Sequence, residues 1–305
     1  MKGKDPFPAL LLISGPTGSG KSALAESLSA EFDLPILSAD SRQVYRYFDI
    51  GTAKPDKEIL QALPYEMIDI LEPEEKFSAG KFAARAADLI EHKYRSSPVV
   101  IIAGGTGFYI SALLEGLADI PDIVPEMDQK WDQFYAEEGL PGLQRKIKQI
   151  DPLFYEKGNL ENPQRLIRAL KVADQTGKSL LNYEPVPFLR KTTPRLEIAI
   201  QHERPVLYER INQRVDKMVE HGLIEEAENL LKYRDTPAWR TVGYRELLPY
   251  FDGETPLKEA IEKIKQHTRN YAKRQMTWFH KHGNWQWITP GDDARIREWI
   301  VNQLQ

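Results

Sequence analysis

The feature that most constrains the fold is the segment GPTGSGKS at residues 15–22, which fits the pattern G-x-x-x-x-G-K-[ST]. It follows an apolar run at 9–15 (ALLLISG) and opens a helical pattern at 21–32. In this context the pattern predicts a phosphate-binding loop (P-loop) between a strand and a helix. We expect it to be formed by Gly15, Pro16, Thr17, Gly18, Ser19, Gly20, Lys21 and Ser22. Lys21 is expected to neutralise phosphate and Ser22 to hold Mg²⁺, but such a loop recognises a diphosphate without demanding a nucleotide.

Strand and helix patterns alternate around this loop. Continuous apolar strands that alternate with helices predict a parallel sheet covered on both faces, and hence an α/β fold with a P-loop. Further strands are expected at 34–40, 98–105, 195–201 and 284–288. Further helices are expected at 78–96, 108–116, 204–222, 222–233 and 256–282.

The segment 117–191 differs in character, because prolines recur and no convincing strand is present. Asn162 and Pro163 begin a helical pattern that Gly177 ends, which is the expected punctuation of a helix. We therefore expect an all-helical insertion domain at 117–191. The α/β core is then formed by 1–116 and 192–305.

The composition excludes several classes of protein. No apolar run reaches the length of a membrane span, and the absence of cysteine excludes disulfides and thiolate metal sites. The six histidines show neither zinc-ligand spacing nor a catalytic triad. A cytoplasmic protein without membrane association is expected. The net charge of −4 means that any binding of nucleic acid depends on local basic patches.

Two further motifs are expected at the carboxyl edge of the sheet, where ligands bind in open α/β folds. Asp40 follows one strand, and its carboxylate could ligate Mg²⁺, cap the next helix or act as a base. Another strand ends in Gly104-Gly105-Thr106-Gly107, where many P-loop proteins carry an acid. The two glycines would allow the backbone to approach a ligand. Thr106 offers either a hydroxyl for the site or a helix N-cap.

Basic residues gather in three places. Arg165 and Arg168 share one face of the predicted helix in the insertion. The stretch 267–282 mixes basic and aromatic side chains, which suits contact with phosphate and stacking on bases, although a solvated amphipathic helix has the same pattern. Arg210 and Arg214 follow an apolar stripe, and one of them could reach back over the P-loop.

Together these residues closely resemble the tRNA dimethylallyltransferases, also called tRNA isopentenyltransferases. The resemblance spans nearly the whole chain in order. Its motifs are GPTGSGKS, SADSRQVYRYFDIGTAKP (38–55), MIDILEP (67–73, with Asp69), AGGTGFYISALLEGL (103–117), NPQRLIRAL (162–170), ERINQRVDKM (209–218), TVGYREL (241–247) and TRNYAKRQMTWF (268–279). Those around DIGTAKP and GGTGFYI are far more specific than the P-loop.

The resemblance implies transfer of a dimethylallyl group from dimethylallyl diphosphate to the N6 amine of adenosine 37 in the anticodon stem-loop of tRNA. The P-loop would then hold the diphosphate, with Mg²⁺ at Ser22 and no need for ATP. Lys21 and Arg214 would stabilise the leaving group, Asp40 would be the general base, and Thr106 would position these groups. By the same likeness the flipped adenine and the tRNA would be contacted by Asp40, Ser41, Arg42, Gln43, Gln164, Arg165, Leu166, Ile167 and Arg168. Because the chain has no cysteine, the resemblance is to the bacterial form without a zinc finger. A monomer is expected.

Two other functions fit parts of the sequence. A small-molecule kinase would use the same P-loop, with Asp40 as base toward a hydroxyl, but it leaves the basic stretches without a role. A non-catalytic RNA-binding protein or nucleotide switch leaves Asp40 beside a complete P-loop without a task. The resemblance favours the transferase.

Overall fold

The computed structural model describes residues 7–305, and the chain divides into two compact units. The core unit runs up to Leu114 and resumes at Phe188, and the insertion unit is Glu115–Pro187. The division lies within a few residues of the boundaries expected from the sequence. Each unit is described by itself.

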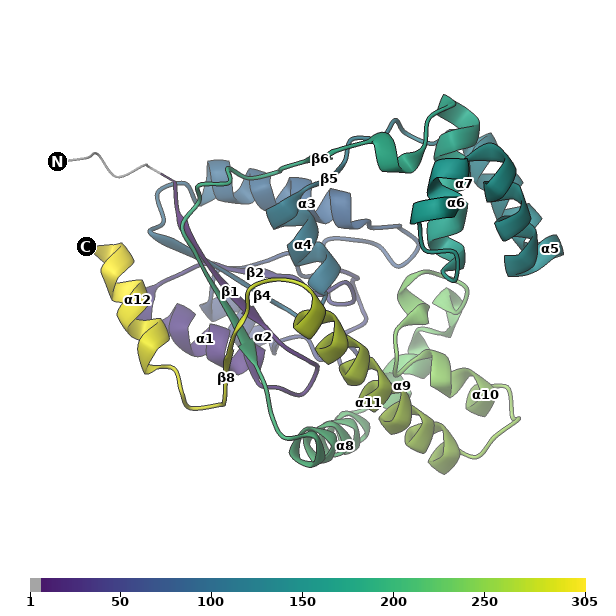
Figure 1. Ribbon diagram of the computed structural model, residues 1–305. Helices are drawn as coiled ribbons and strands as arrows, with labels where there is room; N and C mark the ends of the chain where they lie inside the picture. Colours follow the sequence, from purple (N-terminus) through teal and green to yellow (C-terminus); the bar gives the residue numbers. More distant parts are fainter. Residues whose placement is uncertain (1–6) are drawn as a thin grey trace. The chain divides into compact units, whose positions relative to one another are not determined.

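The core unit is built on a six-stranded parallel sheet with the strand order β3-β2-β4-β1-β7-β8 (Figure 1). Its strands are β1 Ala9–Ser14, β2 Ile36–Ser38, β3 Tyr65–Glu66, β4 Val99–Gly104, β7 Arg195–Ile200 and β8 Gln286–Ile288. The five predicted strands are confirmed, although β2 and β8 are shorter than expected. The predicted parallel α/β fold is also confirmed. The two-residue β3 was not predicted, because so short a segment leaves no pattern.

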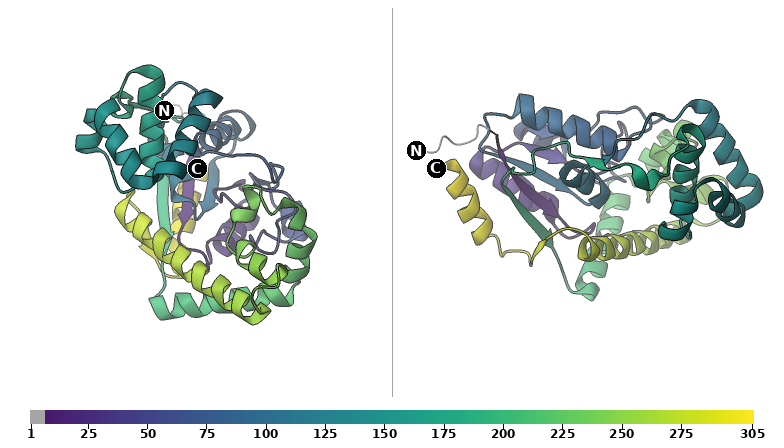
Figure 2. Two further views of the ribbon diagram at one scale, coloured as in Figure 1. Left: turned by 90° about the vertical axis from the view of Figure 1, so that its right-hand side faces the viewer. Right: turned by 45° about the horizontal axis from the view of Figure 1, so that its top comes forward.

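Helices cover both faces of this sheet (Figures 1 and 2). Leu11 and Ile13 of β1 pack in one cluster with Leu28 of α1 and Ile296 of α12, whereas Leu10, on the opposite face of the strand, is also fully buried. The core helices are α1 Lys21–Phe32, α2 Lys57–Ala62, α3 Ala79–Asp88, α4 Gly107–Glu115, α8 Arg204–Glu220, α9 Leu223–Asn229, α10 Leu248–Phe251, α11 Leu257–Lys281 and α12 Ala294–Leu304. The helix predicted at 78–96 is α3 followed by one wider turn, Leu89–Lys93.

The parallel register brings the carboxyl ends of three central strands to one edge of the sheet. Ser14, the last residue of β1, pairs with Gly104 of β4 and with Ala199 of β7. Ser38 of β2 pairs with Ala103 of β4. The P-loop, Asp40 and the 104–107 turn therefore all leave the sheet at this edge.

The insertion unit packs its helices around a small apolar core of its own, which includes Trp131, Leu143, Phe154 and Leu166. Its helices are α5 Pro125–Ile150, α6 Pro152–Lys157 and α7 Pro163–Thr176, and α5 is kinked at Gly139. The expectation of an all-helical unit is corrected in one respect. The two ends of the insertion pair as an antiparallel ribbon, β5 Leu117–Ala118 with β6 Pro185–Val186.

Within residues 7–305, no helix combines the length and the apolar character needed to cross a bilayer.

Candidate functional site

The P-loop wraps the N-terminus of α1 in a backbone conformation that glycine makes possible. Gly15, with φ of 144°, passes so close to β7 that a Cβ atom would lie 2.8 Å from the carbonyl oxygen of Ile200. Gly20 adopts the left-handed region, with φ of 95°, immediately before the first residue of α1. The first amides of α1 therefore open directly at the loop, which is the arrangement that attracts phosphate.

Two side chains from the β7–α8 segment bond to carbonyl oxygens of the P-loop. The ring nitrogen Nε2 of His202 lies 2.9 Å from the carbonyl oxygen of Ser19. Nε of Arg210 donates to the carbonyl oxygen of Gly18 at 2.8 Å. Arg210 is thus the arginine that reaches back over the loop, which leaves Arg214, one helical turn further along α8, to face the interior of the site.

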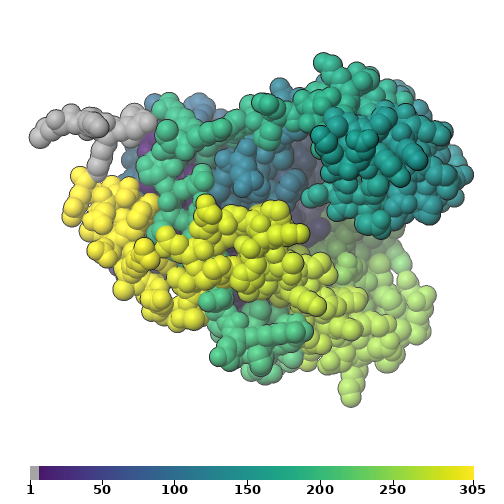
Figure 3. Space-filling model, viewed as in Figure 1, coloured from purple at the N-terminus to yellow at the C-terminus, as the bar shows by residue number. Residues whose placement is uncertain are grey.

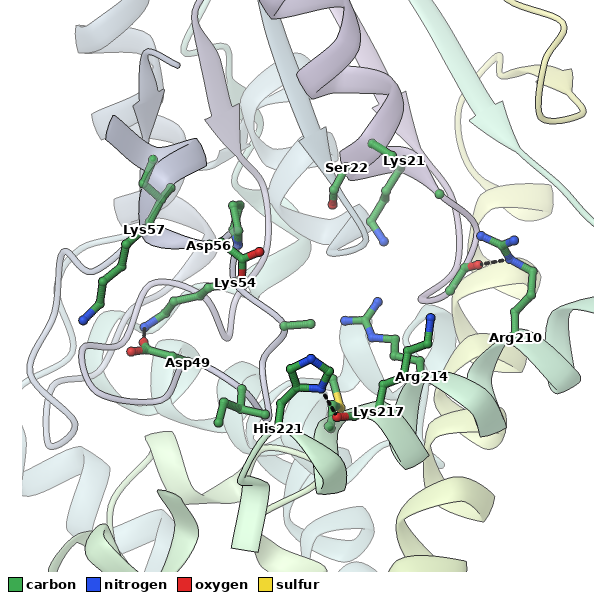
Figure 4. Close-up of a pocket in the computed structure, with 18 of the residues that line it drawn as sticks. Lys21, Ser22, Asp49, Lys54, Asp56, Lys57, Arg210, Arg214, Lys217 and His221 are labelled. Carbon is green, nitrogen blue, oxygen red and sulfur yellow. Dashed lines mark hydrogen bonds and ion pairs between the residues drawn. The ribbon is translucent and has the colours of Figure 1, made fainter. Parts of the chain in front are cut away.

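A cavity of about 620 Å³ lies against the loop. We call it the diphosphate cavity; it is walled by the P-loop, by the segment 49–57 and by α8 (Figure 4). In Figure 4 the side chains of Lys21 and Arg214 point into this space from opposite walls. Ser22 stands beside Lys21 at the start of α1 and is exposed.

Burial dominates the electrostatics of the two cations. It lowers the pKa of Lys21 to about 8, with nearby Asp40 opposing this shift and Arg214 adding to it. Burial also lowers the pKa of Arg214 from its usual value, again opposed by Asp40. Lys21 and Arg214 are both desolvated, repel each other and share Asp40 as their acidic neighbour. A bound anion would therefore stabilise this site.

Lys54 of the DIGTAKP motif also lines the diphosphate cavity, but its ammonium group is fully engaged. It donates to the carbonyl oxygen of Tyr45 at 2.6 Å, to Oδ1 of Asp49 at 2.6 Å and to Oδ1 of Asp69 at 2.5 Å. An ammonium group has three donors, so none remains for a ligand. The motif therefore builds the cavity wall, and Asp69, which the sequence singled out only by resemblance, is part of that wall.

A second cavity of about 200 Å³ meets the first along Lys21, Arg214 and Met218, which line both. We call it the basic cavity, because six cations line it and Asp40 is its one acidic residue. The cations are Lys21, Arg42, Arg214, Arg240, Arg245 and Arg274. Such a surplus of positive charge favours a polyanionic ligand.

Asp40 lines the basic cavity, and Thr106 is bonded to the residue that follows it. Oδ1 of Asp40 accepts the backbone N–H of Arg42 at 2.8 Å, which fixes the orientation of the carboxylate. Oγ1 of Thr106 accepts the backbone N–H of Ser41 at 3.0 Å. The Thr106 hydroxyl thus connects the turn after β4 to the turn after β2. This bond is made to Ser41, whereas a helix N-cap would accept an N–H from the first turn of α4.

Tyr271 of α11 also lines the basic cavity. Burial raises the pKa of Tyr271 to about 12; the charge of Asp40 acts in the same direction, and Arg42 and a hydrogen bond with Thr106 oppose it. Its neutral phenol therefore lies beside both Asp40 and Thr106. The sequence named Tyr271 only as one aromatic residue in a basic stretch, and nothing in its spacing showed this proximity.

The glycines of the 104–107 turn make room for protein neighbours, which corrects the expectation that they admit a ligand. A Cβ atom on Gly104 would lie 2.1 Å from the carbonyl oxygen of Ala39, and one on Gly105 would lie 2.3 Å from Nε2 of Gln275. Gln275 is a buried residue of α11 that sequence reasoning missed. The repeated glycines were its only signal, because they mark a close approach without naming the partner.

Three of the residues predicted to contact tRNA have other tasks. Gln43 is buried; its amide accepts from Ser38 Oγ at 2.9 Å and donates to the carbonyl oxygen of Ala53 at 2.9 Å. Leu166 and Ile167 fill the core of the insertion unit. Burial argues against direct contact between these three side chains and tRNA. Among the residues of α7 predicted to contact tRNA, Gln164, Arg165 and Arg168 are exposed.

The residues fit Mg²⁺ only as an ion that arrives with its ligand. Among residues 7–305, no group of three or more histidine and acidic side chains is placed to hold a metal. Mg²⁺ commonly keeps several waters and takes one or two protein oxygens together with substrate phosphates. The exposed hydroxyl of Ser22, beside Lys21 in the diphosphate cavity, suits that mode of binding.

The fold and the site define a P-loop α/β protein with a helical insertion, in which an aspartate and a P-loop lysine line one cavity. More specifically, the chain belongs to the IPP transferase family, whose model matches residues 43–282.

Curated relatives span almost the entire chain. A tRNA dimethylallyltransferase of Limosilactobacillus reuteri is 40% identical over 309 residues, which cover 97% of this chain and 99% of the relative. The tRNA dimethylallyltransferase 1 of Bacteroides thetaiotaomicron is 38% identical over 294 residues and 96% of both chains.

Solved structures agree. The full-length tRNA isopentenylpyrophosphate transferase of Bacillus halodurans has a TM-score of 0.69 at 35% identity, covering 97% of this chain and 96% of the other. A eukaryotic dimethylallyltransferase acting on tRNA has a TM-score of 0.81 at 24% identity, covering 96% of this chain and 78% of the other, which shows a shared fold.

Proposed function

We propose that this protein transfers a dimethylallyl group from dimethylallyl diphosphate to the N6 amine of adenosine 37 in tRNA, releasing diphosphate. The observation that carries the proposal is the meeting of the two cavities. Lys21 and Arg214 belong to both, so an anion held by the P-loop would lie next to the compartment that contains Asp40. The relatives named tRNA dimethylallyltransferase support the same assignment.

The reaction needs stabilisation of the leaving diphosphate and removal of a proton from the amine. The diphosphate cavity would supply the first and Asp40 in the basic cavity the second. The bond between the allylic carbon and the diphosphate oxygen breaks, and the charge that develops on the diphosphate would be stabilised by Lys21, Arg214 and the loop amides. A bond forms between that carbon and N6, whose proton passes to the carboxylate of Asp40. Thr106 would hold the Asp40 turn in place through its bond to Ser41. No nucleoside triphosphate takes part.

The magnesium requirement is part of the proposal. Ser22 would supply one oxygen ligand to an ion that the diphosphate brings with it. The bound ion would supply positive charge beside the leaving group.

The basic cavity fits the RNA side of the reaction. Its cations would meet phosphates around an adenine flipped out of the anticodon loop, which places the base within reach of Asp40. Arg274 also borders a groove along the C-terminal half of α11, and in the space-filling view α11 is exposed at the surface (Figure 3). The groove is lined by Asn270, Lys273, Arg274, Thr277, Trp278, Lys281 and His282, a set without an acidic residue. Basic and aromatic side chains of this kind suit a single-stranded RNA segment.

The direct test is a transfer assay with an anticodon stem-loop, dimethylallyl diphosphate and Mg²⁺, without ATP. We expect one dimethylallyl group on a stem-loop with adenosine at position 37, detected by mass spectrometry, and none on a matched stem-loop with guanosine there. The kinase alternative predicts no transfer and instead consumption of ATP with a small alcohol. That result would overturn the proposal.

The insertion unit is proposed to contact the anticodon arm through its exposed side chains. Arg165→Ala should weaken stem-loop binding several-fold and lower the salt dependence of binding by about one phosphate contact. Arg145→Ala is the matched control, because Arg145 is an exposed arginine of the same unit that pairs with Glu138. Equal affinities and salt slopes for the two variants, measured by fluorescence anisotropy, would contradict the placement of Arg165.

A further inference from the structure

The inner face of α11 lies along the 104–107 turn. Tyr271, Gln275 and Trp278 are spaced at i, i+4 and i+7, so they share one face of the helix. Tyr271 contacts Thr106, Gln275 contacts Gly105, and a Cβ atom on Gly107 would lie 2.2 Å from the Trp278 ring. These three contacts hold the 104–107 turn against α11.

Gln275 is the one residue of this face that also holds the P-loop. Its Oε1 accepts the backbone N–H of Thr17 at 2.9 Å, and its Nε2 donates to the carbonyl oxygen of Gly105 at 2.9 Å. The orientation of the amide is unambiguous, because a backbone N–H can only donate and a carbonyl can only accept. The residue is 7% exposed, so neither bond is exchanged easily for water.

The two bonds connect the two halves of the site. The P-loop follows β1 and carries Lys21, whereas Gly105 immediately precedes Thr106, whose hydroxyl holds the turn of Asp40. Since Thr17 gives its N–H to Gln275, that amide does not belong to the anion cradle. Its bond serves the geometry of the loop.

We propose that Gln275 is a positioning residue that fixes the spacing between the P-loop and the Thr106–Asp40 turns, so that the diphosphate and the base that takes the proton stay in register. The proposal rests on the transfer reaction proposed above. It assigns to Gln275 an effect on turnover rather than on the binding of either substrate. The reason is that Lys21, the loop amides and the cations of the basic cavity are all still present when the Gln275 amide is removed, and only the spacing between the two groups of residues changes.

The test uses Gln275→Met in the full-length protein, because methionine keeps the length of the side chain and removes both hydrogen bonds. We expect kcat to fall about 10- to 100-fold, as for a small misplacement of reacting groups. The KM for dimethylallyl diphosphate and the Kd for the stem-loop should each change by less than about threefold. Gln266→Met is the matched control, since Gln266 lies on the same helix and lines neither cavity, and its kcat should stay within about twofold of the wild-type value.

Three outcomes overturn the inference: a kcat for Gln275→Met equal to that of the control, a loss confined to KM, or a loss that disappears when the assay temperature is lowered to match the Tm difference. Gln275→Glu guards against general loosening, because it retains an acceptor for Thr17 and loses the donor for Gly105. We expect it also to lose turnover, and its Tm is measured alongside that of Gln275→Met, because the new carboxylate is buried and faces the carbonyl oxygen of Gly105. Normal turnover in this variant would show that the Gly105 bond has no role in positioning. The wild-type assay separates the two proposals. Absence of transfer by the wild type would contradict the proposed function, whereas transfer by the wild type with unchanged kcat in Gln275→Met would contradict only the role of Gln275.

Discussion

Two lysines line the same cavity and differ in what they can do there. The side chain of Lys54 is only 3% exposed. Its ammonium group donates its three hydrogen bonds to Tyr45, Asp49 and Asp69. Lys21 makes one long bond, 3.4 Å to the carbonyl oxygen of Pro16, and burial depresses its pKa. The first lysine is satisfied by the protein, and the second is satisfied only when an anion arrives.

A lysine in a family motif is therefore not by itself evidence of ligand binding. The P-loop leaves its lysine short of acceptors because the loop is made of backbone amides and glycines. The lysine of DIGTAKP is surrounded by acceptors from its own segment and from its neighbours. Two residues around it adopt the strained left-handed region: Ala53 of DIGTAKP, with φ of 48°, and Asp69 of MIDILEP, with φ of 52°. The P-loop thus holds a cation that lacks a partner for its charge, whereas the lysine of DIGTAKP stabilises the fold of its own segment.

Replacement of Lys21 should give the largest effect. Lys21→Met removes a charge aimed at the leaving group, so we expect kcat to fall about 10²- to 10³-fold. The thermal stability should be unchanged or higher, because a desolvated charge is lost from the free protein. Single-turnover transfer and thermal unfolding measure the two effects. Activity within tenfold of wild type would show that Lys21 does not face the diphosphate.

Replacement of Lys54 should give the opposite pattern. Lys54→Met leaves Asp49 and Asp69 without their shared partner, and we expect the free energy of unfolding to fall by about 1–3 kcal/mol. The side chains of these acids are 49% and 42% exposed, so water limits the loss. Pyrophosphate affinity, measured by calorimetry, should change by less than about threefold. If that affinity collapses while the stability is retained, the two lysines do not divide these tasks.

The pH dependence of pyrophosphate binding sharpens the contrast further. Because burial lowers the pKa of Lys21 to about 8, this group loses its positive charge as the pH rises above that value in the free protein. Affinity should therefore fall on the alkaline side of pH 8, by up to about tenfold per pH unit. In Lys21→Met only the titration of pyrophosphate itself should remain. Superimposable profiles for the two proteins would contradict the depressed pKa.

Much of the core was predictable from the sequence, because each of its signals is local. The apolar run before Gly15 and the helical pattern after Gly20 fix the P-loop, and parallel strands bring Asp40 and Thr106 to the same edge of the sheet. The helix α12 was missed, although Ile296 and Ile300 close one face of the core. Its apolar residues Ile296, Trp299 and Ile300 recur at helical spacing, so the sequence did contain a signal for this helix.

The partners of the site could not be predicted, because they come from distant parts of the chain. Gln275 is 258 residues from Thr17 and 170 from Gly105, and no periodicity records such a contact. Gln43 was assigned to tRNA by its place in a motif, yet it holds the DIGTAKP segment through the carbonyl oxygen of Ala53. A motif identifies residues that matter, whereas only packing shows whether a side chain faces the ligand or the protein.

The central claim is that Lys21 serves the diphosphate and Asp40 serves the proton of the amine. The most direct measurement pairs single-turnover transfer with pyrophosphate binding in Asp40→Asn, which keeps an oxygen acceptor for the N–H of Arg42. We predict that transfer falls about 10²- to 10⁴-fold. Pyrophosphate binding should stay equal or become tighter, because a negative charge near Lys21 is removed. Near-normal transfer, or weakened pyrophosphate binding with transfer retained, would contradict the account.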